Sequence, residues 1–256
     1  MENWLALAIG GVFSGVLAGI LGIGGGFIIV SLLVALGYSP IQAVATSSLV
    51  IIMSSSTGSF YNWRMGYLDL QRVVYIAIPA ILTAPLGAYL AGSIPDYVLL
   101  TVFSCFLLIN IGLMRLRKRI VARETGSAKT FNPIVSRIAT GAIAGFLAGL
   151  LGIGGGAIMV PLQLLLLNEE IKVAVRTSLG VIVTATISSC VLHATQGNVL
   201  FVPGLIVGIG GIIGTQFGAR VLPNLPNSLV SQIFTVFLAA MAVLNFWQAW
   251  QSYQNT

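Results

Sequence analysis

Long apolar runs separated by short polar turns dominate the pattern of this chain. Eight such runs occur, four on each side of a basic segment, and they cover residues 4–36, 40–62, 73–92, 97–114, 138–167, 171–192, 203–222 and 228–250. A helix needs about 20 apolar residues to cross the hydrocarbon core of a bilayer. Strands of a membrane barrel would instead alternate apolar and polar residues. The pattern therefore predicts an all-α polytopic membrane protein.

The first run of each set is too long for one span and too short for two. A straight helix over residues 4–36 would reach about 50 Å, against a hydrocarbon core of about 30 Å. The sequence Leu-Gly-Ile-Gly-Gly-Gly interrupts this run at 21–26 and recurs at 151–156 in the run 138–167. We expect each run to form a re-entrant hairpin, with two short helices meeting at the glycine turn inside the membrane. A single tilted, broken span is the alternative.

The chain also shows an internal duplication. The glycine motif repeats at an offset of 130 residues. Further identities follow at an offset of 131: Ala43-Val44 with Ala174-Val175, Thr46-Ser47 with Thr177-Ser178, Gly66 with Gly197, Gly87-Ala88 with Gly218-Ala219, and Pro95 with Pro226. We therefore expect two homologous membrane repeats, 1–114 and 138–256, joined by a basic cytoplasmic linker at 115–137.

The hairpin decides how the two repeats are oriented. A hairpin returns to the face that it entered, and three spans follow it, so each repeat would cross the membrane an odd number of times. The second repeat would then be inverted relative to the first, as in many secondary transporters. With a single broken span, each repeat would cross four times and the repeats would be parallel. We favour the inverted arrangement.

Composition supports the membrane assignment, since 57% of the 256 residues are hydrophobic and 7% are charged. The net charge of +6 is concentrated in the linker. Seven of the twelve basic residues lie there: Arg115, Arg117, Lys118, Arg119, Arg123, Lys129 and Arg137. Between apolar spans, such a cluster predicts a cytoplasmic loop beside anionic lipid headgroups rather than a nucleic-acid site.

The glycine motifs are the first candidates for chemistry. Each triplet precedes a short predicted helix, whose first N–H groups lack intrahelical partners and favour negative charge. We expect a substrate anion to bind at these glycines, Gly24, Gly25, Gly26, Gly154, Gly155 and Gly156. Close helix packing is the alternative for any membrane glycine. We assign that role to a separate set, Gly11, Gly15, Gly19, Gly141, Gly145 and Gly149.

Polar side chains in the spans are the second group of candidates. Hydroxyl groups can donate to an oxyanion, although they often bond their own backbone. Arg176 could pair with the anion, reach the interface or pair with Glu169 or Glu170. His193 aligns with Asn62 and could equally lie at headgroup level. The candidate residues are Thr46, Ser47, Asn62, Arg176, Thr177, Ser178 and His193.

No Asp or Glu occurs in the middle of a predicted span, and the chain has one histidine and two cysteines that do not match under the repeat. This inventory predicts neither an enzyme nor a cofactor or metal site. The residues fit a transporter of small anions that works by alternating access, with a passive anion channel as the alternative. A homodimer is compatible with the sequence.

The doubled glycine motif, the Thr-Ser pairs and the Gly66 and Gly197 positions resemble the TauE/SafE family of sulfite exporters over residues 5–250. The resemblance implies transport of sulfur-containing anions, such as sulfite, sulfonates and sulfoacetate, across the bacterial inner membrane. Carried over by position, the glycine triplets and the Thr-Ser pairs would form the substrate site.

Overall fold

The computed structural model describes residues 4–123 and 132–254. Within these ranges the chain forms ten α-helices and one short 3₁₀ helix: α1 Trp4–Leu21, α2 Gly26–Ala35, α3 Pro40–Arg64, α4 Leu70–Ala91, α5 Asp96–Arg123, α6 Pro133–Leu151, α7 Gly156–Leu166, α8 Ile171–Thr195, α9 Phe201–Val221, η1 Leu222–Asn224 and α10 Asn227–Gln254. The protein is all-helical, as the apolar pattern predicts.

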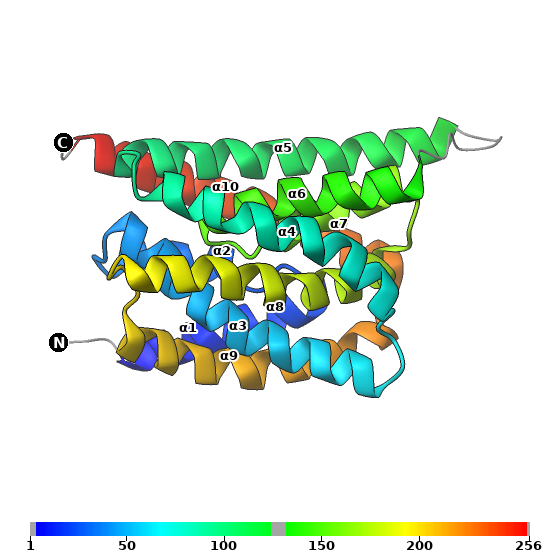
Figure 1. Cartoon of the computed structure of the whole chain (residues 1–256), viewed down its shortest axis with the longest axis horizontal. Helices are drawn as coiled ribbons and strands as arrows, with labels where there is room; N and C mark the ends of the chain where they lie inside the picture. The colour runs from blue at the N-terminus through cyan, green and yellow to red at the C-terminus, as the bar shows by residue number, and fades with distance from the viewer. Residues whose placement is uncertain (1–3, 124–131, 255–256) are drawn as a thin grey trace.

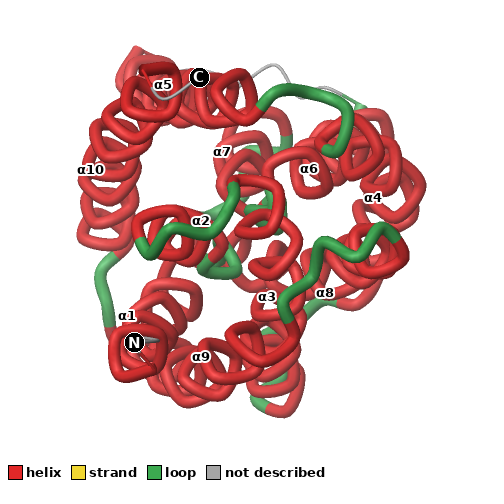
Figure 2. The backbone as a smooth tube through the Cα atoms, turned by 90° about the vertical axis from the view of Figure 1, so that its left-hand side faces the viewer, coloured by secondary structure: helices red, strands yellow, loops and turns green. Residues whose placement is uncertain are grey.

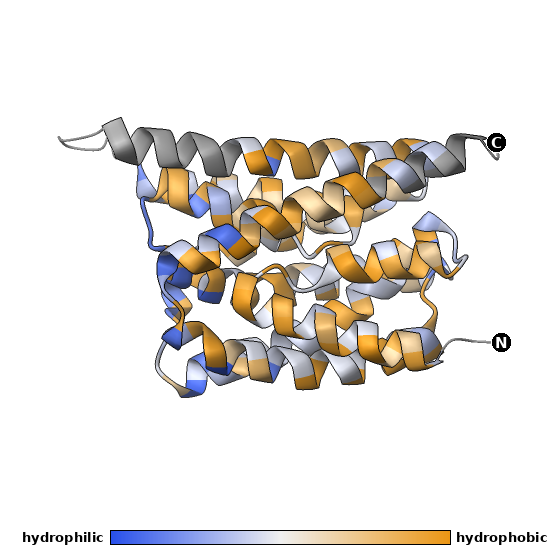
Figure 3. Cartoon of the chain, turned by 180° about the vertical axis from the view of Figure 1, so that it is seen from behind, coloured by the Kyte–Doolittle hydropathy of each residue, from blue (hydrophilic) through white to orange (hydrophobic). Residues whose placement is uncertain are grey.

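The described residues contain seven helical segments that are long and apolar enough to cross a membrane. These candidate spans lie in α1, α3, α4, α6, α8, α9 with η1, and α10. Helices α2 and α7 and the apolar part of α5 are shorter. The chain is therefore a polytopic membrane protein. Figure 3 shows apolar residues along the lengths of the helices and polar residues gathered at one end.

The chain reverses direction at each glycine motif. Gly10 of α1 contacts the side chain of Leu32 of α2. These residues would be about 30 Å apart along one continuous helix. In the second half, Gly155 contacts the Ala144 carbonyl oxygen in the same way. Each apolar run is thus a helical hairpin with unequal arms, 18 and 10 residues in α1 and α2, and 19 and 11 in α6 and α7.

Helices α2, α3, α7 and α8 occupy the middle of the molecule (Figure 2). Around them lie α1 with α9, α4 with α6, and α5 with α10, and both termini lie at the same end (Figure 1). The space between the α5–α10 pair and α2 contains aromatic side chains. The Phe27 ring lies 5.3 Å from that of Phe103, 6.3 Å from that of Phe106 and 6.1 Å from that of Phe237, between centroids.

The six glycines assigned to packing do bring helices together. On α1, Gly11, Gly15 and Gly19 contact the α9 backbone at Val207, Gly211 and Thr215. On α6, Gly141, Gly145 and Gly149 contact the α4 backbone at Ile76, Ala80 and Ala84. A side chain at any of these positions would collide with backbone atoms. Both pairs of helices are therefore packed through small residues, as is common in membranes.

Helix starts follow local sequence signals. Ser39 caps α3 in a reciprocal arrangement with Gln42, and Pro40 is the first helical residue. Asp69 caps α4 by accepting from the Gln71 and Arg72 N–H groups. Asn132 caps α6, ahead of Pro133. These side chains satisfy backbone donors that a helix leaves unpaired at its N-terminus.

The expected linker is partly helical. Helix α5 continues to Arg123 and α6 begins at Pro133, so the boundaries at 114 and 138 do not mark helix ends. Apolarity ends where a helix leaves the hydrocarbon, whereas the helix itself can continue into water because Leu, Arg and Lys are good helix formers. Residues 124–131 of the linker lie outside the described residues.

Candidate functional site

The two glycine loops, Leu21–Gly26 and Leu151–Gly156, have nearly the same backbone conformation. In the first, the φ angles of Gly22, Gly24 and Gly25 are 68°, 74° and 81°. In the second, Gly152, Gly154 and Gly155 have 64°, 73° and 73°. These left-handed values suit glycine, because other L-residues adopt them at a cost of about 1–2 kcal/mol. Glycine at these positions allows the tight reversal of each hairpin.

The two loops contact each other. A methyl group on Gly26 would lie 2.6 Å from the Gly152 carbonyl oxygen and 2.7 Å from Ile153 Cα. In the reciprocal contact, Gly156 touches the Gly22 carbonyl oxygen and lies against Ile23. The turns of both hairpins therefore meet backbone to backbone at one place in the molecule.

This meeting point lies at the middle of the two long central helices. Ile51 is the twelfth residue of the 25-residue helix α3, and Ile182 is the twelfth of the 25-residue helix α8. A methyl group on Gly24 would lie 3.0 Å from Ile51 Cγ2 and 3.3 Å from Ile182 Cγ2. On Gly154 it would lie 2.9 Å from Ile182 Cγ2 and 3.1 Å from Ile51 Cγ2. Both glycines thus face the same two side chains.

Two helices begin at this point. Gly25 precedes α2 and Gly155 precedes α7, and neither N-terminus has a side-chain cap. The first N–H groups of a helix carry partial positive charge and bind anions readily. The glycine triplets, Gly24–Gly26 and Gly154–Gly156, are therefore brought together in the way that the sequence suggests for an anion site.

The structure separates the members of the first Thr-Ser pair. Ser47 Oγ donates to the Gly152 carbonyl oxygen at 2.6 Å, so it contacts the second glycine loop. Thr46 Oγ1 accepts from the Leu200 N–H at 3.0 Å, beside the start of α9. Neighbouring helical residues point about 100° apart, so both hydroxyls cannot face one loop. Ser47 belongs to the loop surroundings, whereas Thr46 anchors the α8–α9 connection.

In the second pair, Ser178 Oγ accepts from Gln163 Nε2 of α7 at 3.1 Å. Gln163 is fully buried, and its amide also donates to the Ala174 carbonyl oxygen at 3.4 Å. Thr177 is buried on the same helix. Ser178 thus ties α8 to the short arm of the second hairpin.

Asn62 and His193 lie near the C-terminal ends of α3 and α8, and both are buried. His193 Nε2 lies 3.3 Å from the Gly149 carbonyl oxygen, and its Nδ1 has no hydrogen-bond partner among the described residues. Asn62 Nδ2 is also without one. His193 is therefore covered by protein atoms, and its position near the end of α8 leaves both its site role and a headgroup-level position as predictions.

Arg176 stacks on an aromatic ring rather than pairing with a carboxylate. Its guanidinium carbon lies 4.1 Å from the centroid of the Tyr67 ring, and its Nε has no hydrogen-bond partner among the described residues. Glu169 pairs instead with Arg72, at 3.2 Å between Nη1 and Oε1. Arg176 is half-buried at the end of the molecule from which α8 starts.

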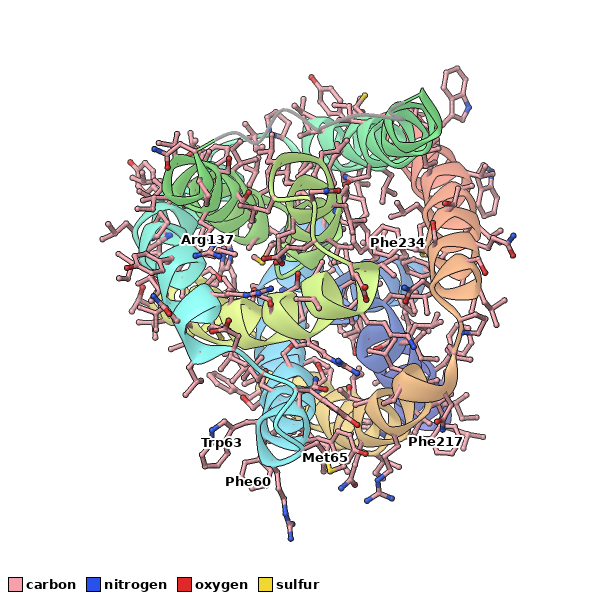
Figure 4. The ribbon with its side chains drawn as sticks, turned by 90° about the vertical axis from the view of Figure 1, so that its right-hand side faces the viewer. Phe60, Trp63, Met65, Arg137, Phe217 and Phe234 are labelled. Carbon is pink, nitrogen blue, oxygen red and sulfur yellow. The ribbon has the colours of Figure 1, made fainter. Side chains whose placement is uncertain are left out.

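The Lys and Arg residues whose side chains the structure describes gather at this same end, here called the basic face. They belong to the ends of α3 and α9 and to the starts of α4, α6 and α8: Arg64, Arg72, Arg137, Lys172, Arg176 and Arg220. Figure 4 looks onto the basic face, with Arg137 beside α4 and with Phe60 and Trp63 at the rim. Aromatic side chains commonly mark the membrane interface, and basic residues mark its cytoplasmic side.

The ion pair on the basic face links two distant parts of the chain. Arg72 begins α4, whereas Glu169 lies in the connection between α7 and α8. Burial raises the pKa of the Glu169 carboxyl, although Arg72 and Arg137 act in the opposite direction. Glu169 therefore takes up a proton at a higher pH than an exposed glutamate does. Protonation removes the charge of the carboxylate, so the Arg72–Glu169 ion pair weakens as the pH falls through this raised pKa.

Several residues around the glycine loops are not singled out by the sequence. Ile51 and Ile182 flank the loops, Ser54 Oγ donates to the Gly24 carbonyl oxygen at 3.2 Å, and Ser55 Oγ lies 3.3 Å from the position of a methyl group on Gly24. Ser55 and Thr186 are equivalent at the offset of 131, so the duplication pairs two hydroxyl residues at these positions. Because α3 and α8 carry many other hydroxyl residues, this pair does not stand out in the sequence.

The all-helical, membrane-spanning fold defines a polytopic membrane protein, and the two glycine loops that meet at its middle are its candidate site. The family model for the sulfite exporter TauE/SafE matches residues 7–244. The chain belongs to this family, whose members are membrane transporters and not enzymes.

Curated relatives agree with this assignment. The chain is 28% identical over 241 residues to the probable membrane transporter protein YunE of Bacillus subtilis, covering 86% of this chain and 88% of that protein. It is 24% identical over 236 residues to the probable membrane transporter protein YjnA of the same organism, covering 86% and 90%. A probable membrane transporter protein of Methanocaldococcus jannaschii is 28% identical over 211 residues, covering 80% and 76%.

Proposed function

We propose that this membrane transporter moves small anions, sulfite or organosulfonates, across the bacterial inner membrane by alternating access. The observation that carries the proposal is the meeting of the two glycine loops at the middle of α3 and α8, where two uncapped helix N-termini begin. Broken helices whose N-termini point at an anion near the midplane are a recurring feature of secondary transporters. The sulfur chemistry is supported by the family description.

The two halves fit inverted repeats. Residues equivalent under the duplication, at an offset of 130 for the glycines and 131 for their partners, make equivalent contacts: Gly152 lies against Val44, and Gly22 lies against Val175. Gly15 lies against Gly211, and Gly145 lies against Ala80. The Arg72–Glu169 pair favours the inverted arrangement over the parallel one, which would put these residues on opposite sides of the membrane.

Inverted repeats suggest how the site would open to each side. If one repeat rocks against the other, the glycine loops would stay at the pivot while the surrounding helices separate alternately at the two faces. The close glycine contacts between α1 and α9 and between α4 and α6 join one helix from each half. We expect these two pairs to move as rigid units.

Arg176 would attract the anion at the basic face. We expect Arg176→Ala to raise the KM for transport about fivefold and to leave the maximal rate nearly unchanged, because a charge at the rim steers association more than it stabilises the bound state. Initial rates of uptake in proteoliposomes over a range of substrate concentrations measure both quantities. Arg64→Ala removes an exposed arginine from the same face and is the matched control. Equal KM values for Arg176→Ala and the wild type would remove Arg176 from the transport path.

The substrate is tested by uptake of labelled anions into proteoliposomes. Sulfite, sulfate, thiosulfate, taurine and sulfoacetate are offered separately at equal concentrations. Saturable uptake of a sulfur oxyanion or a sulfonate is the expected result. Uptake of none of these anions by correctly inserted protein would contradict the sulfur assignment. Rapid uptake of all of them without saturation would indicate a channel.

A further inference from the structure

Two buried hydroxyl groups on the central helices α3 and α8 have no hydrogen-bond partner within the described part of the chain. Ser55 on α3 and Thr186 on α8 are 0% and 1% exposed, and neither hydroxyl makes a hydrogen bond. Most other buried hydroxyls of these helices bond a backbone carbonyl, as Ser48 does with the Val44 carbonyl oxygen at 3.3 Å. A buried hydroxyl without a partner is costly to the fold, so a bound ligand is a natural explanation for both groups.

The position of Ser55 points to the glycine site. Its Oγ is among the three atoms nearest to a methyl group built on Gly24, at 3.3 Å. The other two belong to the central isoleucines, Ile51 and Ile182. Ser55 lies one helical turn beyond Ile51, and Thr186 lies one turn beyond Ile182, so each shares a helix face with an isoleucine that contacts both glycine loops.

The surroundings of this site carry no charged side chain among the described residues. The described Lys, Arg, Asp and Glu residues lie at helix ends and in connections. Arg176 is the nearest of them to Ile182 along α8, about 9 Å away along the helix axis, and it stacks on Tyr67. The donors at the centre are therefore backbone N–H groups and uncharged hydroxyls.

We infer that Ser55 and Thr186 are ligands of the transported anion, and that this uncharged site selects singly charged oxyanion head groups over doubly charged ones. The inference rests on the proposed function of the glycine loops. The cost of transferring an ion from water into a medium of low dielectric grows with the square of its charge, so it is about four times larger for a dianion. Hydroxyl and amide donors without a cation offset this cost for one charge more readily than for two.

The inference predicts different uptake for the singly and the doubly charged forms of sulfite. Sulfite exists as the monoanion hydrogen sulfite in mildly acidic solution and as a dianion in mildly alkaline solution. Methanesulfonate remains a monoanion throughout this range. Uptake of sulfite at a fixed total concentration should fall at least about fivefold as the pH rises and the monoanion is depleted, whereas uptake of methanesulfonate should change little. Methanesulfonate also controls for titration of the protein, including His193.

The hydroxyls are tested by Ser55→Ala and Thr186→Val. Each should raise the KM for methanesulfonate about tenfold, because a hydrogen bond to a charged group is lost. The midpoint of thermal unfolding in detergent should be unchanged or higher, since an unpartnered buried hydroxyl is removed. Ser48→Ala is the matched control, because Ser48 is fully buried on the same helix and its hydroxyl already has a partner. It should leave the KM for methanesulfonate unchanged.

The outcomes are distinct. A KM for methanesulfonate that stays at the wild-type value in both variants, or uptake of sulfite that rises with pH, would overturn the inference while leaving the transporter intact. The pH series uses the wild-type protein, so it decides between monoanion and dianion even if a variant does not fold. If the wild-type protein takes up neither anion, the proposed function fails and the inference fails with it.

Discussion

Gly24→Ala and Gly154→Ala are each expected to lower the rate of anion transport at least about tenfold in a protein that remains folded. The added methyl group would occupy the space between the two central isoleucines, 3.0 Å from Ile51 Cγ2 for Gly24 and 2.9 Å from Ile182 Cγ2 for Gly154. Both contacts are with side-chain atoms rather than with backbone, so we expect small movements of the two isoleucines to accommodate the methyl group while the fold is kept. The methyl group would nevertheless cover the backbone donors of the proposed anion site.

Backbone strain has to be separated from blockage of the site, and the chain provides matched controls. Gly66 and Gly197 have φ angles of 71° and 75°, close to the 74° and 73° of Gly24 and Gly154. A methyl group on either control glycine would meet nothing within 4 Å. Gly66→Ala and Gly197→Ala therefore add the same strain, about 1–2 kcal/mol, without blocking the loops, and they should transport normally. Equal loss of transport in all four variants would show that strain alone causes the effect.

Gly155 is a poorer probe of the site than Gly24 or Gly154. A methyl group on Gly155 would collide with the Ala144 carbonyl oxygen inside its own hairpin, and one on Gly25 would lie 2.9 Å from Ser14 Oγ. Bulky residues at these positions are expected to damage the hairpin as well as the site. Loss of transport in such variants could not be assigned to the anion alone.

Gly145→Val is expected to destabilise the whole protein, by about 3 kcal/mol or more, because overpacked side chains force backbones apart. The Cβ of the new residue would collide with the Ala80 carbonyl oxygen and lie 2.6 Å from Thr83 Oγ1. Thr83 donates to the Ala142 carbonyl oxygen at 2.8 Å, and separation of α4 from α6 would break this bond as well. The midpoint of thermal unfolding in detergent, followed by size-exclusion chromatography, measures the effect.

The control for Gly145→Val is Gly112→Val on α5, where a methyl group would meet nothing within 4 Å. Both substitutions put a β-branched residue in place of a helical glycine, so differences in helix propensity largely cancel. The Gly112 variant should unfold near the wild-type temperature. If both variants unfold at the wild-type temperature, the close packing of α6 on α4 does not contribute to stability in the way described.

The sequence was most informative about the spacing of glycines and the lengths of apolar runs. The spacing of Gly11, Gly15 and Gly19 predicts a packing face, and the structure confirms it as the contact with α9. The length of the run 4–36 predicts a hairpin, and the contact between Gly10 and Leu32 confirms that the chain folds back. Both predictions depend on chain length and on the lack of a side chain, which can be read directly from the residues.

The sequence was least informative about which side chains face the loops. Helices α3 and α8 carry hydroxyl residues on several faces, so no apolar stripe indicates how each helix is rotated. The sequence for this reason predicts one role for Thr46 and Ser47, although their side chains point in different directions. The sequence does not distinguish Ser55 from the other hydroxyl residues of α3, although its Oγ lies beside Gly24. Only the three-dimensional arrangement distinguishes these positions.

The measurement that tests the central claim most directly is counterflow in proteoliposomes. Vesicles loaded with a high concentration of unlabelled substrate anion are diluted into a trace of labelled anion, and the label inside is followed with time. An alternating-access transporter predicts transient accumulation of label above its outside concentration, which Gly24→Ala should abolish and Gly66→Ala should preserve. Label that enters only to equilibrium, unaffected by the internal anion, would contradict the account and identify a channel.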